Sequence, residues 1–214
     1  MPRSMPDLRG ELQRRSLEAL ALAEIGEIAR LEALAGSRTK TQLHAYRLEA
    51  LYEMAYLRIF VSWESFLEQA FLRFLCGYTS VHGAATLLPG TNFLANLAQA
   101  ETAVLGGNTY VLWHNPTKVV NRCRRFFHTS TIESIVASNT ARLEAFAAIR
   151  HRIAHAQSDA KQKFDSATML LVGRRYRGAR PGAFLRDRDT SVSPPERWLD
   201  RLSQELLNLS QQVT

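Results

Sequence analysis

The chain has few cysteines and lacks the compact motifs that mark common metal and nucleotide sites. Cys76 and Cys123, the only two cysteines among 214 residues, are far apart and form no CxxC pair. We expect both to be reduced thiols of a helical core. The sequence contains no GxxxxGK[ST], GxGxxG or HExxH motif and no Cys/His cluster with zinc spacing. It therefore predicts no metal site and no cofactor.

Long apolar runs are also missing from the sequence. No stretch approaches the roughly 18 to 20 apolar residues that a membrane span requires. Glu18, Glu24 and Glu27 interrupt the apolar residues near the N-terminus, so we expect no signal peptide. The hydrophobic content of 46% and the charged content of 22% are typical of globular proteins. These features predict a cytoplasmic protein without a membrane partner.

Positive charge is concentrated in one part of the chain. Between Lys118 and Thr190 there are 15 basic and six acidic residues, a net charge of +9, whereas the whole chain carries +7. The rest of the chain is therefore slightly acidic. A basic region of this kind indicates a polyanionic partner, and nucleic acid is the commonest.

The spacing of apolar residues predicts an all-α bundle of about six or seven helices in one domain, residues 1–214. A long aromatic-rich helix over 41–75 is expected at the centre, because no glycine or proline lies between Ser37 and Cys76. Residues 1–35 and 193–211 should supply the terminal helices around a core of 41–171. Capping patterns predict helix starts at Asn115, Ser130, Ser158 and Ser193, and a basic loop or small hairpin is expected near 173–192.

The segment Asn139–Asp159 is the most unusual helix that the sequence predicts, with an expected cap at Asn139. On a helical wheel of about 100° per residue, Phe146, Ala147, Ile153 and Ala154 lie within about 80° of Leu143. Arg150 lies roughly 20° from the axis of this apolar stripe, where a guanidinium is costly unless an anion meets it. His151 and His155 lie side by side at the flank, whereas Arg152 points away and is expected to be solvated.

Arg150 and His155 have the spacing of a family motif. The sequence Arg150-His-Arg-Ile-Ala-His155 matches the R-x4-6-H motif of the HEPN superfamily, which consists of small all-α domains. The long earlier helix with Trp63-Glu64 resembles the RiboL-PSP-HEPN subgroup, and the resemblance covers roughly Thr41 to Leu171. Family members commonly have Asn or Asp after the arginine, where this chain has His151.

The resemblance implies a metal-independent endoribonuclease. In such enzymes the 2′-hydroxyl of the RNA attacks the adjacent phosphate and leaves a 2′,3′-cyclic phosphate. A histidine can transfer the proton near neutral pH, and an arginine can hold two phosphate oxygens. We therefore assign proton transfer to His155 and phosphate binding to Arg150. The family also implies a homodimer in which two motif helices form a composite site.

Each of these assignments has a simpler alternative. Arg150 can extend to the surface or pair with a buried carboxylate such as Glu64 or Glu144, and these two acids are also the candidates to orient it. His151 can polarise the 2′-hydroxyl or form a hydrogen bond at a dimer seam. Basic side chains around an aromatic ring can bind RNA or simply cover a solvated surface; they are Arg124, Arg125, Arg174, Arg175, Tyr176 and Arg177.

Three functions remain open on sequence grounds. The first is the endoribonuclease, with RNA as substrate; the resemblance places such enzymes in toxin–antitoxin or phage-defence systems, where an antitoxin protein is a possible partner. The second is a non-catalytic HEPN-type module that binds a nucleotide, RNA or a partner protein. The third is a basic helical protein in which the motif occurs by chance.

Overall fold

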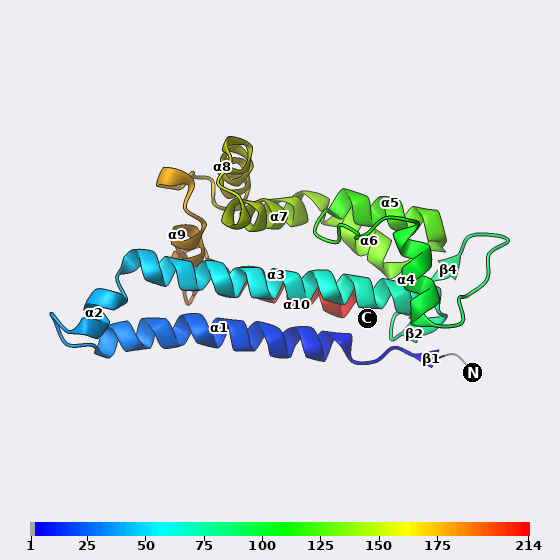
Figure 1. Ribbon diagram of the computed structural model, residues 1–214, viewed down its shortest axis with the longest axis horizontal. Helices are drawn as coiled ribbons and strands as arrows, with labels where there is room; N and C mark the ends of the chain where they lie inside the picture. Colours follow the sequence, from blue (N-terminus) through cyan, green and yellow to red (C-terminus); the bar gives the residue numbers. More distant parts are fainter. Residues whose placement is uncertain (1–2) are drawn as a thin grey trace. The chain divides into compact units, whose positions relative to one another are not determined.

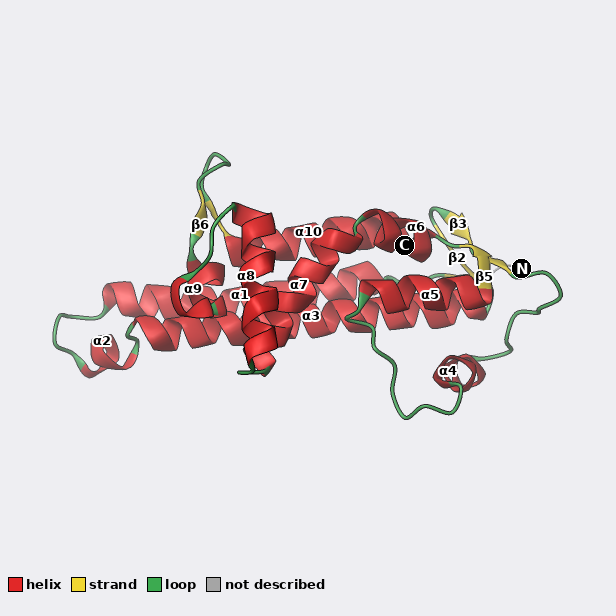
Figure 2. Ribbon diagram, turned by 90° about the horizontal axis from the view of Figure 1, so that it is seen from above, coloured by secondary structure: helices red, strands yellow, loops and turns green. Residues whose placement is uncertain are grey.

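The computed structural model of this chain describes residues 3–214, and every structural statement below concerns that range. Helices make up most of it (Figure 1). The strands are short; β1 precedes the first helix, and the others lie in the connections between helices (Figure 2). In chain order the elements are β1 (Arg3–Ser4), α1 (Leu8–Glu32), α2 (Arg38–Gln42), α3 (Ala45–Leu75), β2 (Tyr78–Ser80), β3 (Gly83–Ala84), β4 (Thr86–Leu87), α4 (Leu97–Leu105), α5 (Pro116–Phe126), β5 (Phe127–Thr129), α6 (Thr131–Ser138), α7 (Thr140–Ala154), α8 (Ser158–Val172), the 3-10 helix η1 (Arg177–Ala179), α9 (Pro181–Arg186), β6 (Arg188–Asp189), β7 (Glu196–Arg197) and α10 (Trp198–Val213).

The predicted all-α class is confirmed, but the predicted number of helices is wrong. Residues 3–214 contain ten α-helices rather than six or seven. The helices α2 and α9, which the sequence analysis did not predict, are only five and six residues long. Elements this short show no helical period in the sequence. No helix of the described range is long and apolar enough to cross a membrane.

Two of the five predicted helix caps form as expected. Asn115 Oδ1 accepts a hydrogen bond from the amide of Lys118 at 2.9 Å, and Ser130 Oγ accepts one from the amide of Glu133 at 3.1 Å. Helix α8 begins at Ser158 itself, with Gln157 in the cap position. The expected side-chain cap at Asn139 is also wrong, because its Nδ2 donates backwards to the carbonyl oxygen of Ile135 at 2.8 Å.

The segment near 173–192 is more regular than the predicted basic loop or small hairpin. It includes η1 and α9, and Pro181 begins α9 because its fixed φ suits the first turn of a helix. A hairpin does form, but it joins β6, at the end of this segment, to β7 beyond it. Glu196 therefore lies in a strand and cannot complete a capping box with Ser193. As a result, α10 begins at Trp198 rather than at Ser193.

The described residues form two compact units. The first contains residues 3–12, Trp63–Glu144 and Leu206–Thr214, and the second contains Gln13–Ser62 and Ala145–Glu205. Helices α1, α3, α7 and α10 contribute residues to both units.

The core of the first unit is built on the second half of α3. Phe71 is fully buried, and its ring lies 5.0 Å from that of Phe127 and 5.4 Å from that of Trp113. Around this core β2 pairs with β1 and β3, and β4 pairs with β5. Cys76 and Cys123 are both buried free thiols, as predicted. Burial raises the pKa of Cys123 to about 12.

The core of the second unit lies on both sides of the first half of α3. A Cβ atom on Gly26 of α1 would lie 2.6 Å from Leu51 Cδ1, so the missing side chain lets α1 and α3 pack closely. Helices α8 and α9 lie on the side of α3 away from α1 (Figure 1). There the ring of Phe184 lies 6.2 Å from that of Phe164 and stacks on Trp198 at 5.5 Å.

A buried hydroxyl fixes α7 against α3 within the second unit. Tyr56 has no exposed surface, and its hydroxyl donates to the carbonyl oxygen of Phe146 at 2.8 Å. Burial raises the pKa of Tyr56 well above its ordinary value. In a regular helix the carbonyl of Phe146 also receives the amide of Arg150. The hydroxyl therefore anchors the turn of α7 that carries the predicted motif.

We predict that Tyr56→Phe lowers the free energy of unfolding by about 1 kcal/mol, because the substitution removes one buried hydrogen bond and leaves the ring packed. Urea denaturation followed by circular dichroism measures this change. Tyr46→Phe is the matched control, since Tyr46 lies on the same helix with its side chain exposed. An equal loss in both variants would contradict the role of the Tyr56 hydroxyl.

Candidate functional site

The structure brings His151 and His155 together at the end of α7. Their ring centroids are 4.6 Å apart, with an angle of 48° between the rings. His155 follows the last residue of α7, and its amide donates to the carbonyl oxygen of His151 at 2.9 Å. The helical path therefore continues to His155, which explains why the two side chains are neighbours. His155 is exposed and His151 is half-buried.

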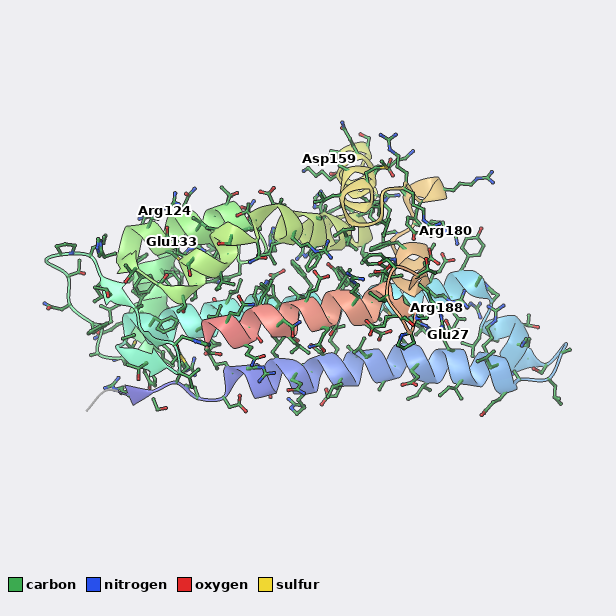
Figure 3. The ribbon with its side chains drawn as sticks, turned by 180° about the vertical axis from the view of Figure 1, so that it is seen from behind. Glu27, Arg124, Glu133, Asp159, Arg180 and Arg188 are labelled. Carbon is green, nitrogen blue, oxygen red and sulfur yellow. The ribbon has the colours of Figure 1, made fainter. Side chains whose placement is uncertain are left out.

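Asp159 joins the two histidines from the next helix. Its Oδ2 atom lies 3.6 Å from His151 Nε2 and 3.3 Å from Lys163 Nζ, and Figure 3 shows it at the start of α8. The hydrogen bond from Lys163 lowers the pKa of Asp159, and His151 acts in the same direction. Asp159 was not among the residues predicted for the site. The chain turns between α7 and α8, so no helical spacing in the sequence reveals this contact.

Arg150 lies at the edge of the buried face of α7, not at its centre. Leu143, Phe146 and Ile149 are almost fully buried, whereas Ala154 is exposed and Arg150 is half-buried. The buried stripe is therefore rotated towards Phe146 and Ile149 relative to the predicted stripe. The helical wheel counted Ala147 and Ala154 as core residues, but Ala147 is half-buried and Ala154 is exposed. The predicted stripe was therefore centred too far from Ile149 around the helix.

Arg152 is not the solvated charge that the sequence predicted. Its Nε donates to the carbonyl oxygen of Ala179 at 3.1 Å, and its Nη1 donates to that of His155 at 3.4 Å. Ala179 is the last residue of η1 and has a positive φ of 46°. Arg152 thus links the end of α7 to the basic segment that follows α8.

Two residues of the predicted RNA-binding set are held by one carboxylate. The Tyr176 hydroxyl donates to Asp187 Oδ2 at 2.6 Å, and Arg174 forms an ion pair with the same oxygen. Burial and the hydrogen bond to Asp187 raise the pKa of Tyr176 to about 12. The tyrosine ring also lies 5.3 Å from that of Phe184. Its ring is therefore partly occupied by contacts within the protein.

The other predicted basic residues are exposed but belong to different units. Arg175 and Arg177 lie in the second unit, with the histidines. Arg124 and Arg125 lie on α5 in the first unit, where Arg124 pairs with Glu133 at 2.7 Å (Figure 3). Their contact with RNA stays a prediction.

The two carboxylates predicted to orient Arg150 each make a contact within the first unit. Glu64 Oε2 lies 4.0 Å from His114 Nδ1. Glu144 Oε1 accepts a hydrogen bond from the hydroxyl of Thr117 at 3.1 Å. The role of either carboxylate in orienting Arg150 stays a prediction.

Carboxylates of α3 hold α9 in place. Glu49, which is buried, pairs with Arg180 through Nε at 2.9 Å and through Nη2. Glu53 accepts a hydrogen bond from the amide of Gly182 at 2.9 Å, and burial raises its pKa. A Cβ atom on Gly182 would lie 2.4 Å from the carbonyl oxygen of Glu49, so only glycine fits at this contact. The sequence analysis named none of these three anchors.

A carboxylate of α1 holds the other end of α9. Glu27 Oε1 lies 2.6 Å from Arg186 Nε and 3.4 Å from Arg197 Nη1. Burial raises the pKa of Glu27, but the hydrogen bond and the charges of these arginines outweigh it, so the pKa is lowered. Glu27 and Arg180 are labelled in Figure 3. Arg180 and Arg186 pair with buried carboxylates, so they support the fold of this segment.

No group of three or more His, Cys, Asp or Glu side chains in residues 3–214 has an arrangement that could hold a metal ion. Comparison of the chain with protein families, with curated proteins and with solved structures finds no match. The resemblance to HEPN proteins therefore stays a prediction that depends on the motif residues.

We predict that Gly182→Ala lowers the free energy of unfolding by about 1–3 kcal/mol, because the new methyl group would overlap the backbone of Glu49. Chemical denaturation measures the loss, and hydrogen exchange should show faster opening of residues 177–187. Ala183→Ser, at the adjacent half-buried position, is the control and should change stability by less than about 0.5 kcal/mol. Wild-type stability in Gly182→Ala would refute the close approach.

Proposed function

We propose that this protein is a metal-independent endoribonuclease whose catalytic groups are Arg150, His151 and His155. The observation that carries the proposal is the pair of imidazoles 4.6 Å apart, on the helix turn that follows Arg150. Histidines titrate near neutral pH, and an arginine remains charged, so the group combines proton transfer with phosphate binding. A histidine with a purely structural role needs no second imidazole beside it.

The proposed reaction uses the nucleophile of the RNA itself. The 2′-hydroxyl oxygen forms a bond to the adjacent phosphorus as its proton passes to a histidine. The bond from phosphorus to the 5′-oxygen breaks, and that oxygen leaves with a proton as a 5′-hydroxyl. Arg150 holds the non-bridging oxygens, where negative charge increases in the transition state. The products are a 2′,3′-cyclic phosphate end and a 5′-hydroxyl end.

Asp159 adds a reason to give His151 an active part. The carboxylate of Asp159, 3.6 Å from Nε2, places a negative charge beside the ring on the side of α8. The exposed arginines Arg175 and Arg177, in the same unit, offer positive charge for the RNA backbone. Their contribution should be sequence-independent, because phosphate contacts carry no base information.

The proposal includes a homodimer with composite sites. Because His155 continues the helical path of α7, it points about 140° away from Arg150 around the helix axis. A phosphate held by Arg150 of one subunit is therefore better placed for a histidine of a second subunit. We place the enzyme in a toxin–antitoxin or phage-defence setting, with an antitoxin protein as a further partner. The alternative function is a binding module that holds RNA without cleaving it.

We predict that Arg150→Ala with His155→Ala abolishes RNA cleavage, with a loss of at least about 100-fold for His155→Ala alone. Cleavage in EDTA, followed by analysis of the RNA ends, measures the activity. His44→Ala, an exposed histidine of the same unit, is the control and should cleave normally. Loss of cleavage in EDTA would refute metal independence. RNA binding by the wild type without cleavage would support the binding module instead.

We predict that mixing Arg150→Ala subunits with His155→Ala subunits restores about a quarter of wild-type activity. Half of randomly mixed dimers are heterodimers, and each would contain one intact site of two. The mixture is assayed after co-refolding or co-expression, with each variant alone as the control. If the mixture is as inactive as its parents, both residues act within one chain and the composite site is wrong.

A further inference from the structure

The outer side of α1 carries a row of apolar side chains that face solvent. We call Leu17, Ala21, Glu24, Ile28 and Leu31 the outer seam. All five are exposed, and the three large apolar side chains, of Leu17, Ile28 and Leu31, are 56%, 44% and 75% exposed. The residues follow one another at intervals of four, three, four and three, which is the spacing of a coiled-coil seam. All belong to the second unit.

The opposite face of α1 already packs against its own unit. Ala19, Ala23, Gly26 and Glu27 are buried, and Gly26 lies against Leu48 and Leu51 of α3. The helix is therefore apolar on two opposite sides, and the fold of one chain uses only one of them. A solvated surface helix normally has charged residues on its outer side. The outer seam therefore does not contribute to the packing of the monomer.

Other large apolar side chains of the second unit are exposed as well. Leu22 and Ile25 of α1 are 51% and 61% exposed, and Met54 and Val61 of α3 are exposed as well. The outer seam with Ile25 presents an apolar area of the order of several hundred Å², and patches of that size mark protein interfaces. Two such patches together approach the roughly 1,200 Å² at the lower end of stable interfaces.

The charges along the seam favour an antiparallel arrangement of two identical helices. Arg14 lies three residues before Leu17 and pairs with Glu18 on the same helix, and Glu32 follows Leu31; Arg14 and Glu32 are both exposed. In a parallel pair Arg14, Glu24 and Glu32 would each face the same charge. In an antiparallel pair the arginine end of one helix lies at the glutamate end of the other. The same patch therefore complements itself across a two-fold axis.

We propose that the outer seam of α1 binds a second copy of this chain as an antiparallel helix pair. Leu17 packs against Ile28 of the partner subunit, and the two-fold axis repeats this layer at the other end. Arg14 lies beside Glu32 of the partner subunit. Glu24 lies opposite Ala21 of the partner subunit, whose small side chain leaves the carboxylate a path to water.

This contact is independent of the proposed nuclease function. Within the second unit, α7 and α8 lie on the other side of α3 from α1 (Figure 1). A pair formed through the outer seam therefore leaves His151 and His155 of each subunit apart. The composite site proposed above would need a second contact, made through α7.

We predict that Leu17→Glu with Ile28→Glu weakens self-association through the seam at least about 100-fold, because four charges then meet in the seam. Sedimentation equilibrium follows the mass, which should fall from twice 24.1 kDa to 24.1 kDa if the seam is the only contact between subunits, and to the mass of the dimer joined through α7 if the composite site also forms. Leu22→Glu is the matched control, because Leu22 is a similarly exposed leucine about 140° around the same helix. The control should keep the wild-type mass, and all variants should keep wild-type helicity.

Disulfide trapping tests the direction of the pair. In Leu17→Cys with Ile28→Cys, mild oxidation should link position 17 of one chain to position 28 of the other, as shown by peptide mapping; native Cys76 and Cys123 are buried and should not react. Links between identical positions would overturn the antiparallel arrangement. A monomeric wild type, or a wild-type mass that Leu17→Glu with Ile28→Glu leaves unchanged, would overturn the proposed interface. An unchanged mass together with restored activity in mixed Arg150→Ala and His155→Ala subunits would leave the composite site intact.

Discussion

A row of polar groups on one side of α3 determines how the second unit is assembled. Glu49, Glu53 and Tyr56 are spaced four and three residues apart, so they lie on one face of the helix. Glu49 pairs with Arg180, Glu53 receives the amide of Gly182, and Tyr56 donates to Phe146. Each is partly or fully buried, and leaving such a group without its partner costs about 1–3 kcal/mol. The basic segment and the motif helix are therefore both fixed by α3.

The long helices and the class of the fold could be predicted from sequence because they depend on local patterns. The caps at Asn115 and Ser130 and the long α3 follow from residues that are close in the sequence. The short α9 could not be predicted, because its position depends on Glu49 and on the glycine at position 182, more than a hundred residues later. Of the site, the neighbouring histidines follow from helical spacing, whereas Asp159 and the contacts of Arg152 depend on the turn between two helices.

The site residues differ in how firmly the fold holds them. The turn of α7 at Arg150 is anchored by a buried hydrogen bond, whereas His155 lies beyond the end of the helix and is exposed. Phosphate binding in the proposed reaction requires a fixed charge, and proton transfer requires access to the substrate. The arrangement places the arginine on the rigid part of the helix and the outer histidine at its end. Asp159 and Arg152 restrain this end without burying it.

The contact between Gly182 and Glu49 also defines a sequence pattern that can be sought in other chains. A backbone that touches a carbonyl oxygen at this distance tolerates no side chain, so the packing and the glycine must occur together. The sequence pattern Glu-x3-Glu-x2-Tyr in a long helix, followed much later by Arg-Pro-Gly, therefore describes one assembled structure rather than two separate motifs. Chains with both patterns should share the second unit even where their overall sequences have diverged beyond recognition.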